Sequence, residues 1–80
     1  MYVLTVTNFA DTCTGHERTV SFYRSYEDAR TAAARTASVD DLTVDTRHWS
    51  RAGADVVAAN GVFVDREGVP LYGFRIAREP

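Results

Sequence analysis

The chain has 80 residues, of which 45% are hydrophobic and 25% charged, with a formal net charge of −2. This length predicts a single domain over residues 1–80 with a thin core, because small domains bury only about 60% of their unfolded surface. The composition excludes a disordered chain, and the acidic balance disfavours binding to nucleic acid or to anionic membranes.

Cysteine content and hydropathy favour a cytoplasmic protein. Cys13 is the only cysteine, which excludes an intramolecular disulfide and suits a reducing compartment. No apolar run approaches the roughly 18–20 residues that span a membrane, so we expect no membrane contact. The first residues enter an alternating pattern without a basic segment before an apolar one, so no signal peptide is expected.

The first half of the chain predicts two strands separated by a loop. Residues 2–7 and 18–23 both alternate between apolar and polar side chains, as strands with one buried face do. Residues 8–16 are rich in turn-forming residues and predict a loop longer than most hairpin connections. In the second strand we expect Val20 and Phe22 to face the helix. The residues expected on its other side are Thr19, Ser21 and Tyr23.

Residues 25–38 predict the only helix. Ser25 is a favourable N-terminal cap, and Asp28 follows three residues later as in a capping box. Glu27 and Asp28 place negative charge at the positive end of the helix dipole. At 100° per residue the apolar side is mostly alanine. This side buries little area, but it allows the helix to lie close to a sheet.

The second half predicts further strands with one ambiguous segment. Residues 42–48 alternate, and residues 49–53 break the pattern. Residues 55–60 fit either a short helix or a strand that turns at Asn60-Gly61, and the β-branched pair Val56-Val57 favours the strand. Residues 62–64 and 69–76 read as a hairpin with a polar turn.

These elements predict an α+β fold. Their order is strand–strand–helix–strand–(strand)–strand–strand, and the simplest assembly is one small antiparallel sheet with the helix packed on one face. A single helix leaves the second face of the sheet to water or to a partner. An uncovered face or a free edge strand also favours self-association into a homo-oligomer.

Chemical motifs are sparse. Cys13 and His16 lie three residues apart and, with His48 and either Asp11 or Asp45, have the ligand types of a zinc site. The same cysteine with either histidine has the makings of a nucleophile and a base. Nothing in the sequence supplies an oxyanion hole, a phosphate-binding loop or a dinucleotide fingerprint. The sequence therefore assigns no catalytic residue, no metal ligand and no cofactor.

Residues 47–51 form the best candidate for partner binding. Trp49 stands between Arg47 and Arg51, and tryptophan and arginine dominate the binding energy of protein interfaces. Tyr23 is a further candidate, because tyrosine combines an apolar ring with a hydrogen-bonding hydroxyl. The alternative for Trp49 is a place in the core, with both arginines solvated.

The chain resembles the small orphan accessory proteins of actinobacterial phages and their hosts in its size, its low cysteine content and its strand–strand–helix–strand–strand order. Its basic residues are all arginine, as expected of a GC-rich genome. The resemblance implies a non-enzymatic module that binds and modulates a host protein. The alternatives are a nucleic-acid-binding protein using the nine arginines, and a small enzyme or metal-binding protein using Cys13, His16 and His48.

Overall fold

The described part of the chain forms one helix and five strands. The computed structural model describes residues 1–8 and 18–79. The elements are β1 (Tyr2–Asn8), β2 (Arg18–Tyr23), α1 (Tyr26–Val39), β3 (Thr43–Ala52), β4 (Asp55–Val64) and β5 (Pro70–Arg78). This confirms the predicted α+β class and the predicted order of the helix and strands. The loop predicted for residues 8–16 lies almost entirely outside the described residues.

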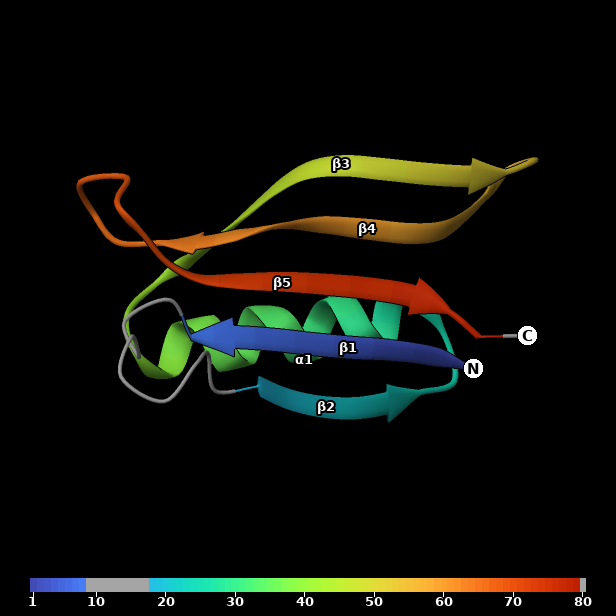
Figure 1. Ribbon diagram of the computed structural model, residues 1–80, viewed down its shortest axis with the longest axis horizontal. Coiled ribbons are helices and arrows are strands. Elements are labelled where there is room, and N and C mark those ends of the chain that lie inside the picture. The colour runs from blue at the N-terminus through green and yellow to red at the C-terminus, as the bar shows by residue number, and fades with distance from the viewer. Residues whose placement is uncertain (9–17, 80) are drawn as a thin grey trace.

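The strands form a single antiparallel sheet in the order β2-β1-β5-β4-β3. Helix α1 lies behind β1 and β5 in the view of Figure 1, so this view looks onto the face that the helix leaves uncovered. Within residues 1–8 and 18–79, the sheet therefore has one face covered by the helix and one face left uncovered, as the single helix predicts. In the described part of the chain, no helix is long and apolar enough to cross a membrane.

Helix α1 begins at its predicted cap and packs through alanine. The backbone N–H of Asp28 donates to Ser25 Oγ at 3.1 Å, which satisfies one of the free donors of the first turn. Ala29, Ala33 and Ala37 are completely buried. Because they are spaced four residues apart, they form one stripe on the helix, and this stripe is the contact with the sheet.

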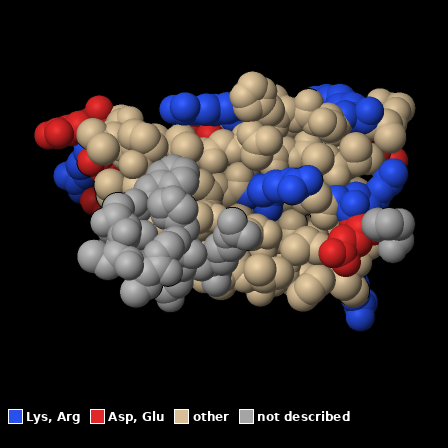
Figure 2. All heavy atoms as spheres, in the orientation of Figure 1, with Lys and Arg blue, Asp and Glu red and all other residues tan. Residues whose placement is uncertain are grey.

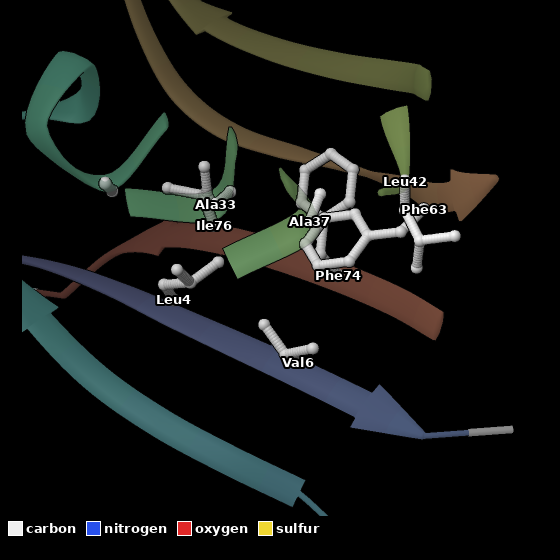
Figure 3. Packing of buried hydrophobic residues seen from close by; sticks show 9 residues of the cluster. Leu4, Val6, Ala33, Ala37, Leu42, Phe63, Phe74 and Ile76 are labelled. Carbon is white, nitrogen blue, oxygen red and sulfur yellow. The ribbon is translucent and has the colours of Figure 1, made fainter. Parts of the chain in front are cut away.

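Larger side chains from the strands complete the core. Figure 3 shows them gathered between the helix and the central strands. Phe63 and Phe74 stack with ring centroids 5.5 Å apart, and Leu4 and Ile76 are fully buried between the alanines of α1 and the sheet. Small helix residues opposite large strand residues thus close a core that an 80-residue chain can fill.

The β3–β4 hairpin differs in two respects from the sequence prediction. Residues 55–60 form a strand as expected, but the chain does not turn at Asn60-Gly61, and β4 runs on to Val64. Residues 49–52 belong to β3, whose pairing with β4 shifts between Thr46 and His48 and again between Ser50 and Arg51. These shifts explain why the alternation fails there although the strand continues.

Gly61 is explained by the approach of β3 rather than by a turn. A Cβ atom at this position would collide with the carbonyl oxygen of Asp45 and would lie 2.9 Å from the Cα of Thr46. The hairpin turns instead at Gly53, where φ is +63° and space around the residue is open. An Asn-Gly pair is therefore a misleading turn signal in this chain, because close packing of backbones also requires glycine.

The orientation predicted for β2 is wrong. Tyr2, Leu4 and Val6 pack toward the helix, and their partners in the register of β1 with β2 are Tyr23, Ser21 and Thr19. Residues directly opposite in an antiparallel pair share a face. Val20 and Phe22 therefore point away from the helix, and they are 53% and 57% exposed.

Candidate functional site

The uncovered side of the sheet, called here the open face, carries two ordered rows of side chains. The register places one residue of each strand in each row. The first row, called the apolar row, consists of Phe22, Val3, Ala77 and Ala58 and ends at Ser50 on β3. The second row consists of Val20, Thr5, Arg75, Asn60 and His48.

The apolar row is continuous across four strands. Strands in a sheet lie about 4.8 Å apart, so the row extends over about 14 Å. Phe22 at its outer end is exposed, and Val3, Ala77 and Ala58 are half-buried with no described element packed over them. Exposed apolar side chains are common singly, but a contiguous set on a flat surface is typical of an interaction site.

Arg75 stands beside the apolar row on the central strand, β5. It is exposed, and within the described residues no ion pair or side-chain hydrogen bond engages it. A basic side chain rises near the middle of the open face in Figure 2, and the acidic side chains lie toward the rim. The centre of the open face is therefore positive although the whole chain is acidic.

A shallow hollow of about 480 Å³ lies next to Arg75. Its open-face lining consists of Thr5, Thr7, Asn60, Gly73 and Arg75. Gly73 contributes only backbone to this lining, between the threonines of β1 and the neighbouring strand β4. The side chains of the other open-face lining residues are neutral hydrogen-bonding groups and one cation, with no carboxylate among the described ones.

Of the predicted binding residues, Arg47, Trp49 and Arg51 all lie exposed on the edge strand β3. The structure does not gather them into one patch. Trp49 pairs with Ala59 on the helix side of the sheet, whereas Arg47 forms an ion pair with Asp45 at 3.4 Å, and Asp45 pairs with Val62 of the open face. The first irregularity of β3, between Thr46 and His48, lies between Asp45 and Trp49. It places these two side chains on opposite faces of the sheet.

The fourth predicted residue, Tyr23, is half-buried on the helix side. It packs against the edge of the core, and its hydroxyl donates to Ser21 Oγ at 3.1 Å. Its place therefore favours a structural contribution. The residues that make up the apolar row, and Arg75, were not singled out from the sequence. The register that aligns them depends on the connection between β1 and β2, which is too long for its residues to fix the pairing.

Trp49 is 54% exposed, because α1 does not extend behind the outer part of β3 (Figure 1). We expect Trp49→Ala to lower the free energy of unfolding by only about 1 kcal/mol, as for a partly exposed side chain. Urea unfolding followed by far-ultraviolet circular dichroism measures this. A loss above about 3 kcal/mol, the size seen for buried aromatic residues, would assign Trp49 to the core instead.

The residues predicted for metal binding or catalysis are only partly described. Cys13 and His16 lie outside the described residues, and His48 is exposed on β3 in the second row of the open face. Among residues 1–8 and 18–79, no three histidine, cysteine, aspartate or glutamate side chains are grouped closely enough to hold a metal ion. The catalytic pairing of His48 with Cys13 therefore stays a prediction.

Comparison with known proteins adds no functional assignment to this geometry. No family model, no curated protein and no solved structure matches the chain. The surfaces of the molecule are therefore the guide to its function. Of these, the open face combines a continuous apolar row with an unpaired central cation, and it is the strongest candidate for a binding site.

Proposed function

We propose that the chain is a non-enzymatic protein-binding module that engages its partner through the open face. The observation that carries this proposal is the exposure of Phe22 at the end of the apolar row, where the sequence pattern had predicted a core residue. A large aromatic side chain in water costs free energy. A partner that covers the open face removes this cost. It also buries the apolar area that the half-buried residues of the row still expose.

In keeping with the resemblance described above, the proposed partner is a host protein that the module modulates. Trp49 lies on the other side of the sheet from Phe22, so it would contribute through a second contact at the edge of the molecule. Self-association through the open face is the competing possibility for the same surface. Sedimentation of the chain at several concentrations distinguishes the two.

The test compares Phe22→Ser with Val39→Ser. Val39 is 84% exposed at the end of α1, so it is a matched apolar control away from the open face. We expect both variants to stay within about 1 kcal/mol of the parent chain in stability, as surface substitutions do. Each immobilised chain is exposed to a lysate of a GC-rich bacterium, with and without nuclease. The retained proteins are quantified by mass spectrometry and the retained nucleic acid by absorbance.

We expect one protein that the parent chain and Val39→Ser retain equally, and that Phe22→Ser retains about tenfold less, as for an aromatic side chain that a partner buries. Equal retention by all three chains would contradict the proposal. If the retained material is nucleic acid that nuclease removes, the nucleic-acid alternative replaces it.

A further inference from the structure

We propose that the open face recognises an acidic and apolar polypeptide segment of its partner, whose carboxylate enters the hollow beside Arg75 while an apolar side chain covers the apolar row. This inference rests on the proposed function and names the chemistry of the partner. Its three supports are the hollow, the unpaired charge of Arg75 and the spacing between Arg75 and the apolar row.

The lining of the hollow suits a carboxylate. The hydroxyls of Thr5 and Thr7 and the amide of Asn60 are hydrogen-bond donors, and Arg75 adds a fork of N–H groups that matches two carboxylate oxygens. The carboxylate would have no acidic neighbour in the lining.

Arg75 is an exposed cation on this surface that no ion pair among the described side chains engages. The two ion pairs among the described residues join Arg47 to Asp45 and Arg66 to Asp41. Asp45 is on the open face through its pairing with Val62, but its charge is matched by Arg47. An incoming carboxylate therefore meets an unpaired guanidinium on the central strand, while the nearest acidic residue of β3 already has a partner.

The spacing fits one short segment of chain. Residues two positions apart on a strand lie about 7 Å apart on the same face. This is the separation between Arg75 in the second row and Ala77 in the apolar row. In an extended partner segment, side chains two residues apart have the same separation. An acidic residue followed two positions later by an apolar one thus reaches both rows at once.

Two other occupants fit the open face less well. A nucleic-acid backbone is bound by several cations that neutralise successive phosphates, whereas the chain has a net charge of −2 and Arg47 of β3 is already paired with Asp45. A second copy packed face to face on a two-fold axis would bring the two central strands together. The two Arg75 side chains would then repel each other.

The test uses 3-phenylpropionate, which carries a carboxylate and an apolar ring, and its neutral analogue 3-phenylpropionamide. Each is titrated into the ¹⁵N-labelled full chain and followed by amide chemical shifts. The variant is Arg75→Gln, and its matched control is Arg35→Gln, since Arg35 is exposed on α1 behind the sheet. Both positions are on the surface, and the spectrum of each variant reports directly that it is folded.

We expect 3-phenylpropionate to shift the amides of Thr5, Gly73 and Arg75, with an affinity about tenfold above that of the amide analogue, as for a charge-assisted hydrogen bond. Arg75→Gln should remove this difference, and Arg35→Gln should leave it intact. Equal affinity for the two probes in the parent chain, or shifts confined to other residues, would overturn the inference.

Two further measurements test the competing occupants of the open face, a nucleic acid and a second copy of the chain. A ten-nucleotide thymidine oligomer that shifts the same amides at lower concentration than 3-phenylpropionate would overturn the inference in favour of nucleic acid. Open-face shifts that depend on protein concentration alone would overturn it in favour of a second copy. If Phe22 still controls capture of a partner while the carboxylate probe fails, the proposed function stands and only the assignment of the carboxylate falls.

Discussion

Replacing Ala33 by aspartate should unfold the domain. Ala33 has no exposed surface, and it lies at the middle of the alanine stripe that contacts the sheet. An aspartate there places an unpaired charge between α1 and the strands, at a cost of about 4 kcal/mol or more. A domain of this size has only about 5 kcal/mol of stability to lose. Far-ultraviolet circular dichroism and urea unfolding measure the result.

The control for this substitution is Ala34→Asp, one position further along α1 on the solvent side. Ala34 is exposed, so we expect a change within about 0.5 kcal/mol. The pair separates the cost of burying a charge from any general effect of aspartate on the helix. A cooperative transition for Ala33→Asp within 1 kcal/mol of the parent chain would show that this side of α1 does not face the sheet.

Gly61→Ala should cost about 3 kcal/mol, which is the upper range for overpacking. The added methyl group meets backbone atoms of Asp45 and Thr46, and backbone cannot move aside by changing a rotamer. We expect β3 to separate locally from β4, with faster hydrogen exchange of the β3 amides. Urea unfolding gives the loss of stability, and exchange measured by nuclear magnetic resonance gives its location.

Gly53→Ala is the matched control for the same hairpin. Space around Gly53 is open, and only its positive φ of +63° opposes a side chain, so the expected loss is about 1 kcal/mol. Equal losses at the two positions, or unchanged exchange in β3 for Gly61→Ala, would contradict the close approach of β3 to Gly61.

The sequence predicts local structure well in this chain because the local signals agree with the fold. Ser25 caps α1 as expected, the alanines of α1 are buried, and Phe74 and Ile76 face the core together. Each of these features depends on residues close together in the chain. The α+β class follows from them, since a helix flanked by alternating strands has few ways to bury its apolar side.

The failures concern pairing between segments. Alternation shows that a strand has two faces but does not show which one meets the helix, so Val20 and Phe22 were assigned to the core. The side that β2 presents is set by its register with β1, and a shift of one residue would reverse it. Likewise, the irregular pairing of β3 obscured its continuation through Trp49. The open face therefore could not be recognised before the strands were aligned.

The two shifts in the pairing of β3 have a consequence for how the sheet ends. An outermost strand presents a line of free backbone N–H and C=O groups, which invites another strand to add and begin an aggregate. Irregularities between Thr46 and His48 and between Ser50 and Arg51 interrupt that line and increase the local twist. Growth by strand addition is thereby discouraged along β3, which leaves the open face accessible to the partner proposed above.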